Sequence, residues 1–141
     1  MPKLLIQKNL QKKVSKVPRE KKEVPTKRGQ GREGEERAVI ALQEAGMQII
    51  ERNVRSPRGE IDIVALDGQT IVFVEVKAWS SFGIENLQYS IDSKKQRRII
   101  ETAKYFLSVH RKYNGKAVRF DVVFIGKNAV THLAAAFMES V

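Results

Sequence analysis

The sequence from Gly59 to Ala78 reads GEIDIVALDGQTIVFVEVKA and contains two runs rich in β-branched and aromatic residues. The first run spans Glu60 to Leu66 and the second spans Thr70 to Ala78, with Asp67-Gly68 between them. An Asp-Gly pair between two such runs is a strong signal for a tight β-hairpin. Both runs are almost continuously apolar, which is typical of strands covered on both faces. We therefore predict a buried hairpin inside an α/β sandwich.

Four charged residues interrupt this apolar hairpin, namely Glu60, Asp62, Glu75 and Lys77. With Asp67-Gly68 as a two-residue turn, Asp62 would lie opposite Phe73, and Glu60 opposite Glu75. Side chains alternate along a strand and opposed residues share a face, so all four should project to one face. Asp62 and Glu75 would then be diagonal neighbours, roughly 7 to 8 Å apart at the backbone. We expect their side chains to converge on one ion.

Carboxylates that share a buried face are costly because each loses water and repels the others. A bound divalent cation removes both penalties, and oxygen ligands without His or Cys favour Mg²⁺ or Mn²⁺ over zinc. Lys77, two residues after Glu75, could orient a water nucleophile or stabilise negative charge on a phosphoryl group. The alternative is that Lys77 is only a salt-bridge partner of Glu60 or Glu75 on a solvated sheet face.

On either side of the hairpin, the sequence predicts further helices and strands. Apolar spacing predicts a first helix before the hairpin and a long second helix after it, which ends near Asn114-Gly115. The order is α, β, β, β, α, β, which predicts a mixed sheet flanked by helices. The expected ranges are helix 31–46, strand 47–55, loop 56–59, helix 92–113, strand 118–125 and a short strand 130–133.

Glu35 falls on the apolar stripe of the first predicted helix, together with Ala38, Val39 and Leu42. A carboxylate in the middle of an apolar stripe should point inward, so we count Glu35 as a further ligand and catalytic candidate. Glu36, about 100° away around the helix, should be solvated. The alternative for Glu35 is a first-turn carboxylate favoured by the helix macrodipole.

The net charge of +10 is concentrated at the start of the chain. Residues 1–28 hold ten Lys or Arg against two Glu, whereas residues 29–141 hold 16 basic and 14 acidic residues. We therefore divide the chain into a disordered basic arm, 1–28, and a folded domain, 29–141. The arm could attract phosphates without regard to sequence, or it could be a solubilising extension.

The composition excludes several classes of protein. The chain has no cysteine, so disulfide scaffolds and thiolate metal sites are excluded. No apolar run approaches the roughly 20 residues of a membrane span, and none resembles a signal peptide. We expect a cytoplasmic protein without a membrane partner.

Four further residues are candidates for nucleic-acid contact. Lys95 and Gln96 flank the apolar stripe of the second long helix, where a solvated helix start is the equal alternative. Arg58 lies in the loop before the hairpin, and Trp79 follows it, where it could stack on a base or, by the alternative interpretation, pack in the core.

Three other polar residues are poor candidates for chemistry. Asp121 alternates with apolar residues on a predicted strand, and we interpret it as structural. His110 lies on an apolar helix stripe and His132 in a short strand, so neither is a good metal ligand or general base.

The hairpin resembles the bacterial YraN-like family of uncharacterised proteins in GEIDIV at 59–64, DG at 67–68 and VFVEVK at 72–77. Further matches are Gly31-Arg32-x-Gly34-Glu35 with Ala38, Arg52-Asn53, 95–98 and RFDVV at 119–123, so the resemblance covers 31–137.

That family is assigned to the restriction-endonuclease-like superfamily of PD-(D/E)xK nucleases and is similar to archaeal Holliday-junction resolvases. The resemblance implies the same α-β-β-β-α-β core order. Asp62 matches the acidic residue of the first strand motif, and Glu75 and Lys77 match the acidic-x-Lys motif. Glu35 matches a carboxylate that the first helix contributes in resolvase-like members. Ile61 stands where the usual motif has Pro, and resolvase-like members often lack that Pro too.

The leading hypothesis is a metal-dependent endonuclease acting on DNA, with a homodimer expected from the resolvase resemblance. One alternative is a module of the same fold that binds nucleic acid without cutting it. Another is a structural protein whose carboxylates hold a metal for stability, which would leave Lys77 without a role.

Overall fold

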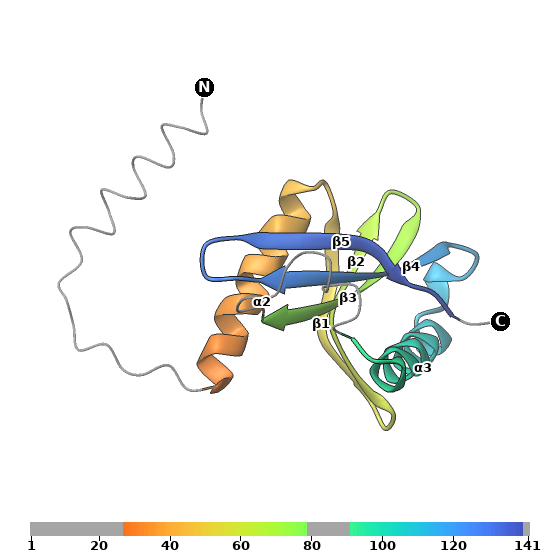
Figure 1. The fold of residues 1–141 in the computed structure, drawn as a ribbon. Coiled ribbons are helices and arrows are strands. Elements are labelled where there is room, and N and C mark those ends of the chain that lie inside the picture. The colour runs from red at the N-terminus through yellow and green to blue at the C-terminus, as the bar shows by residue number, and fades with distance from the viewer. Residues whose placement is uncertain (1–26, 79–90, 140–141) are drawn as a thin grey trace.

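The computed structural model describes residues 27–78 and 91–139, which form two α-helices, one 3₁₀ helix and five strands (Figure 1). In chain order they are α2 (Lys27–Glu44), β1 (Gln48–Ser56), β2 (Gly59–Asp67), β3 (Thr70–Ala78), α3 (Ser93–Val109), η2 (Arg111–Tyr113), β4 (Ala117–Ile125) and β5 (Val130–Phe137). The predicted α/β fold with its α-β-β-β-α-β core order is confirmed, and β5 extends it.

The five strands form one mixed sheet in the order β1-β2-β3-β4-β5. β3 and β4 are parallel and are joined through α3, whereas the other neighbouring pairs are antiparallel. A parallel pair needs such a crossover because the chain must return to the same end of the sheet. Neither α2 nor α3 is long and apolar enough to cross a membrane.

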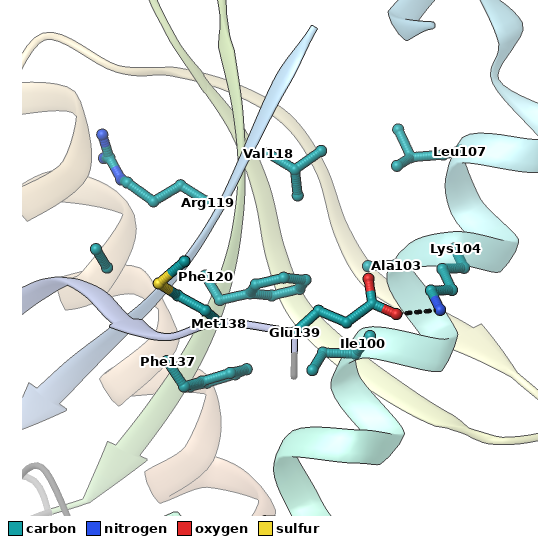
Figure 2. Close-up of a pocket in the computed structure, with 11 residues that line it drawn as sticks. Ile100, Ala103, Lys104, Leu107, Val118, Arg119, Phe120, Phe137, Met138 and Glu139 are labelled. Carbon is teal, nitrogen blue, oxygen red and sulfur yellow. Dashed lines mark ion pairs between the residues drawn. The ribbon is translucent and has the colours of Figure 1, made fainter. Parts of the chain in front are cut away.

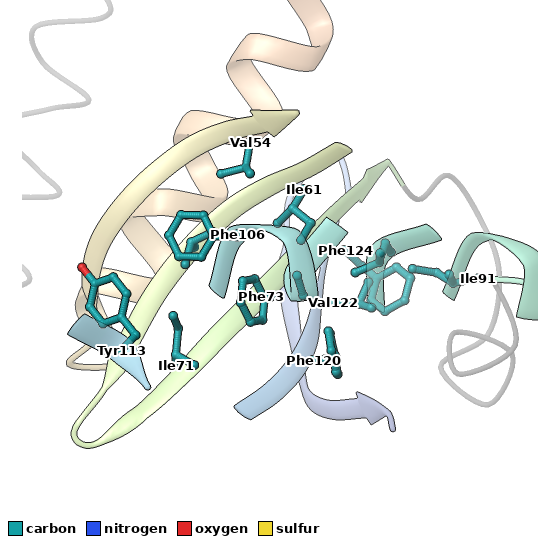
Figure 3. Packing of buried hydrophobic residues seen from close by; sticks show 13 residues of the cluster. Val54, Ile61, Ile71, Phe73, Ile91, Phe106, Tyr113, Phe120, Val122 and Phe124 are labelled. Atoms are coloured by element: carbon teal, nitrogen blue, oxygen red, sulfur yellow. The ribbon is translucent and has the colours of Figure 1, made fainter. Parts of the chain in front are cut away.

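Helices α2 and α3 cover opposite faces of the sheet, as the continuous apolar runs predicted. On the α3 face, Phe73 packs edge-on against Phe106 of α3 and is stacked with Phe120 of β4 (Figure 3). On the α2 face, Ala38 and Leu42 pack against the other side of the same strands. Burial on both faces removes a large apolar area from water, and this is the main stabilising contribution.

The predicted register of the central hairpin is wrong by two residues. Asp67 pairs with Thr70, and Ile63 pairs with Val74, so the turn consists of Gly68-Gln69. Gly68 has φ +59° at the first loop position, where a type II′ turn needs glycine. A shift of two keeps the paired side chains from Ile63 to Asp67 and from Thr70 to Val74 on their predicted faces, because side chains alternate with period two.

The helix boundaries also differ from the expected ones. Helix α2 begins at Lys27, inside the predicted arm, and the chain leaves it through Gly46, whose φ is +90°. Helix α3 ends at Val109, well before the predicted stop at Asn114-Gly115. The following 3₁₀ turn carries Tyr113 back into the core, where its ring is stacked with Phe106. This apolar contact stabilises the structure in which α3 ends at Val109.

Strand β5 is longer than the predicted 130–133, and a buried carboxylate on β4 explains its extension. Asp121 is fully buried and accepts hydrogen bonds from the Arg119 guanidinium and from the Ala135 N–H. His132 Nε2 lies 2.7 Å from its second oxygen. These contacts fix β5 beside β4, which confirms the structural interpretation of Asp121.

Candidate functional site

Asp62 lies where the side-chain alternation of β2 breaks. Ile61 packs in the α3-face cluster and Ile63 in the α2-face cluster, although residues two apart in a regular strand share a face. On β1, between the partners of Ile61 and Ile63, Asn53 has φ +54°. The side chains of β2 therefore change faces at this point. The Asp62 side chain lies at the border between the α3-side layer and the α2-side layer.

The break in β2 lets Asp62 line two cavities, one on each side of the sheet. The carboxylate cavity, of about 220 Å³, lies toward α3 and is lined by Gly59, Glu60, Asp62, Glu75, Lys95, Arg98 and Ile99. The second cavity, of about 810 Å³, lies toward α2 and is lined by Asp62, Glu35, Arg32, Arg55 and their neighbours. The structure thus brings the predicted Glu60, Asp62 and Glu75 together.

Asp62 carries an electrostatic penalty in this position. The Val76 N–H donates a 2.7 Å hydrogen bond to its carboxylate, which fixes the side chain. Burial raises the pKa of Asp62 to about 7, and the negative charge of Glu75 adds to the effect. The Glu35 charge contributes to the same rise. A bound cation would relieve this penalty, because it favours the ionised form of the carboxyl group.

Glu75 is nearly enclosed, and its partner comes from α3. Its side chain is 8% exposed, and its Oε1 lies 2.6 Å from the Lys95 ammonium. Burial alone would lower the pKa of Lys95, but the hydrogen bond and charge of Glu75 outweigh it and raise that pKa. Of the two interpretations of Lys95, the one that reaches the site fits the structure.

Glu35 points inward and Glu36 outward, as the helix phase predicted. The Glu35 side chain is 13% exposed, whereas that of Glu36 is 60% exposed. Arg52 Nε and Asn53 Nδ2 each donate a 3.0 Å hydrogen bond to Glu35 Oε1. Glu35 therefore lines the α2-side cavity with Asp62, and in this structure its carboxylate is engaged by Arg52 and Asn53.

The other predicted site residues lie at different distances from these cavities. Lys77 is partly buried on β3, two residues beyond Glu75, and lines neither cavity as the described residues define them. Gln96 donates to the Ile91 carbonyl and so closes the start of α3. Arg58 is exposed in the turn between β1 and β2. Trp79 lies outside the described residues.

Within residues 27–78 and 91–139, no three His, Cys, Asp or Glu side chains are grouped so as to hold a metal ion. Mg²⁺, however, is usually held in proteins by one or two carboxylates, with water and substrate phosphates completing its shell. Asp62 and Glu75 supply two oxygen-bearing side chains in one cavity, where burial and the charge of Glu75 raise the pKa of Asp62, a penalty that a cation would relieve. The donor set fits Mg²⁺ or Mn²⁺.

The turn between β1 and β2 closes the carboxylate cavity against α3. A Cβ on Gly59 would lie 3.2 Å from the Arg98 Cβ and from the Thr102 hydroxyl, so only glycine fits comfortably. Ser56 and Thr102 hydroxyls are 3.1 Å apart across the same contact. The close approach places Arg98 on the cavity wall. Sequence reasoning did not single out Arg98, although the basic run KKQRR at 94–98 was a signal for it.

Another cavity, of about 690 Å³, lies between the C-terminal half of α3 and the ends of β4 and β5 (Figure 2). Its walls are mostly apolar, and an ion pair between Lys104 and Glu139 crosses its rim. It has no pair of neighbouring carboxylates among its lining residues, so the metal-binding candidates stay in the carboxylate cavity.

Comparison with known proteins identifies relatives over most of this domain. A UPF0102 protein of Persephonella marina is 49% identical over 107 residues, which cover 76% of this chain and 91% of that protein. A UPF0102 protein of Treponema denticola is 40% identical over 121 residues, covering 76% and 93% of the two chains.

Among solved structures, a Holliday junction resolvase of Archaeoglobus fulgidus matches with a TM-score of 0.49 and 18% identity, covering 71% of this chain and 72% of that one. The family described as Uncharacterised protein family UPF0102 matches residues 34–125, a range that contains Glu35, Asp62, Glu75 and Lys77. The chain belongs to this family.

Proposed function

We propose that this protein is a metal-dependent endonuclease that hydrolyses phosphodiester bonds of DNA, with branched or single-stranded DNA in recombination, repair or uptake as the expected substrate. One observation carries the proposal: Asp62 and Glu75 share a small cavity in which burial and the second carboxylate raise the pKa of Asp62. A protein keeps such an arrangement at a cost in stability, and function is the usual reason.

Asp62 and Glu75 are the residues that would hold Mg²⁺ or Mn²⁺. The bound ion would polarise the scissile phosphate and lower the pKa of an attacking water. Asp62 is preorganised for this role because the Val76 N–H fixes one of its oxygens. Glu75 is shielded from bulk water by the sheet and α3, which strengthens its attraction for a cation.

Lys77 follows Glu75 on β3 and is the group we propose for stabilising negative charge on the phosphoryl oxygens. The family resemblance supports this role, because Lys77 matches the lysine of the acidic-x-Lys motif. Glu35 would act through the α2 side of Asp62, once Arg52 and Asn53 release its carboxylate. DNA is the proposed substrate because Lys95 and Arg98 on the cavity wall, and Arg58 in the adjoining turn, offer positive charge to a phosphate backbone.

The test is incubation of the purified full-length chain with supercoiled plasmid, single-stranded DNA, a four-way junction and RNA. Each substrate is offered with Mg²⁺, with Mn²⁺ and with a chelator. We expect metal-dependent cutting of at least one DNA substrate, and its loss in Asp62→Asn and Glu75→Gln variants. Cutting that persists in both variants would point to a contaminating nuclease and remove the proposal.

A second candidate is a module that binds nucleic acid without cutting it. The observation in its favour is that the Glu35 carboxylate is already engaged by Arg52 and Asn53, so that no three-carboxylate metal group forms among the described residues. Electrophoretic mobility shifts measured on the same substrates separate the two. Shifts that occur without cutting under any metal would favour the binding module.

A further inference from the structure

Lys95 reaches the place in the carboxylate cavity where a metal ion would bind. Its ammonium lies 2.6 Å from Glu75 Oε1, and the charge of Asp62 also acts on it. A divalent cation held by Glu75 and Asp62 would be attracted by the same two negative charges. The ammonium and the ion would repel each other at such short range. Both cations therefore compete for the same carboxylates.

The attachment of Lys95 allows its ammonium to leave without moving the helix. The Lys95 N–H donates a 2.8 Å hydrogen bond to Asp92 Oδ1, the N-cap of α3, so the backbone is fixed at this residue. The side chain is 48% exposed, so its flexible stem lies at the mouth of the cavity. A rotation of this stem would carry the charge into solvent, where a nucleic-acid phosphate could meet it.

We propose that Lys95 is a built-in counter-ion, which neutralises Glu75 while the site holds no metal and is displaced toward a substrate phosphate when the metal enters. This inference rests on the proposed function, because it assigns a regulator to the same site. Lys95 then has two effects. It stabilises the metal-free protein, and it weakens metal binding until nucleic acid offers the ammonium another negative partner.

The experiment titrates Mn²⁺ by calorimetry into the full-length wild type and into the Lys95→Ala, Lys95→Arg and Lys94→Ala variants. Lys95→Ala should bind Mn²⁺ about tenfold more tightly or better, since a competing charge is removed. Lys95→Arg keeps the cation and should stay near the wild type. Lys94 is an exposed neighbour on α3 outside the cavity, so Lys94→Ala makes the same charge change and should alter affinity little.

Thermal unfolding of the same proteins supplies a second measurement. Without metal, Lys95→Ala should unfold at a lower temperature than the wild type, because Glu75 loses its partner. Saturating Mn²⁺ should raise the unfolding temperature of Lys95→Ala more than that of the wild type. If Lys95→Ala is too unstable to titrate, Lys95→Gln keeps most of the side-chain packing and provides the same comparison.

The outcomes separate this inference from the proposed function. Unchanged or weaker Mn²⁺ binding by Lys95→Ala overturns the counter-ion, even if the wild type cuts DNA. Tighter binding by Lys95→Ala that vanishes when Glu75→Gln is added supports the counter-ion, even if no substrate is ever cut. A Lys94→Ala variant that binds as tightly as Lys95→Ala would reduce the effect to general charge and also overturn the inference.

Discussion

At the scale of single residues, the proposed chemistry depends on the pKa of Asp62, which lies at the border between the two layers of the core. Asp62 has its pKa raised to about 7 by burial and by Glu75, against 3.8 in an ordinary aspartate. Between pH 3.8 and about pH 7, Asp62 therefore binds a proton more readily in the folded state than in the unfolded state. Stability contributed by Asp62 should rise as pH falls from about 7 toward 4, in the absence of metal.

This gives a prediction for Asp62→Asn, which keeps an oxygen for the Val76 N–H but removes the charge. At pH 8 without metal, the variant should be more stable than the wild type by about 4 kcal/mol, since the pKa of Asp62 is raised from 3.8 to about 7 and each pKa unit is worth roughly 1.4 kcal/mol. At pH 5 the gain should shrink to about 1 to 2 kcal/mol. Urea unfolding in chelator at both pH values measures it, with Glu44→Gln at an exposed helix position as control. A gain independent of pH would mean that Asp62 titrates normally.

For Lys77, the prediction separates the effect of a substitution on metal binding from its effect on catalysis. Lys77→Ala should bind Mn²⁺ at least as well as the wild type, since both carboxylates remain. Its cleavage rate should nevertheless fall by roughly 100-fold or more, the usual cost of losing one preorganised charge-stabilising group. Calorimetry and plasmid cleavage are measured on the same preparation, with Asp62→Asn expected to lose both. Wild-type cleavage by Lys77→Ala would reduce Lys77 to an ion-pairing residue.

The residues show which parts of the site could be predicted from the sequence. Period two alone predicts that Asp62 and Glu75 meet at one cavity, even with a register error of two residues, but it does not predict that Asp62 lies at the border between the two layers. The helical phase alone predicts that Glu35 points inward and Glu36 points into solvent. By contrast, the contact between Lys95 and Glu75 depends on how α3 docks on the sheet, and local patterns carry no information about that distance.

At the scale of elements, the sequence predicted neither the break in side-chain alternation of β2 at Asp62 nor the full length of β5. The first lies opposite Asn53 on the neighbouring strand, whose φ is positive, and the second accompanies the hydrogen bonds that Asp121 accepts from β5. Both arise from pairing between strands, whereas a sequence pattern describes one strand at a time. Element types and order were predictable because they follow from apolar periodicity.

The Asp121 network gives the prediction at this scale. Burial by itself would raise the pKa of Asp121, but hydrogen bonds from His132 and Arg119 outweigh it and lower the pKa. The stabilisation is therefore present above pH 4 and lost as pH falls through the lowered value. Asp121→Asn should cost about 3 kcal/mol at pH 7, since it leaves Arg119 without its buried partner. Urea unfolding checks this, and a loss below 1 kcal/mol would contradict it.

Asp67→Asn is the matched control for this network. Asp67 contacts the same arginine, through Arg119 Nη1 at 2.8 Å, but its side chain is 42% exposed. Exposed ion pairs of this kind contribute roughly 1 kcal/mol or less. The two variants should therefore differ clearly, although each removes one carboxylate from Arg119.

At the scale of the whole molecule, the positive charge and the candidate site lie in different parts of the chain. Residues 29–141 carry a net charge of only +2, and the basic residues that line the carboxylate cavity lie beside a comparable number of acidic ones. Attraction for a polyanion at long range must then come mainly from the arm. We therefore propose that the arm supplies affinity and that the domain supplies the chemistry.

Removing residues 1–26 tests this division, because α2 begins at Lys27 and stays whole. The deletion removes eight Lys or Arg and two Glu, a net charge of +6. DNA affinity should fall, and the slope of log affinity against log salt should become shallower by about 0.9 for each phosphate that the protein no longer neutralises. The unfolding midpoint and Mn²⁺ affinity should not change. Fluorescence anisotropy with a labelled duplex over a salt series measures the slope.

A full-length chain with the eight basic residues replaced by Gln is the control, since it removes charge but keeps length. It should behave like the deletion, because counter-ion release depends on charge and not on the chain itself. A deletion that leaves the salt slope unchanged would make the arm a solubilising extension. A deletion that unfolds the protein would instead show that residues before Lys27 belong to the core, and the domain boundary would have to move toward the start of the chain.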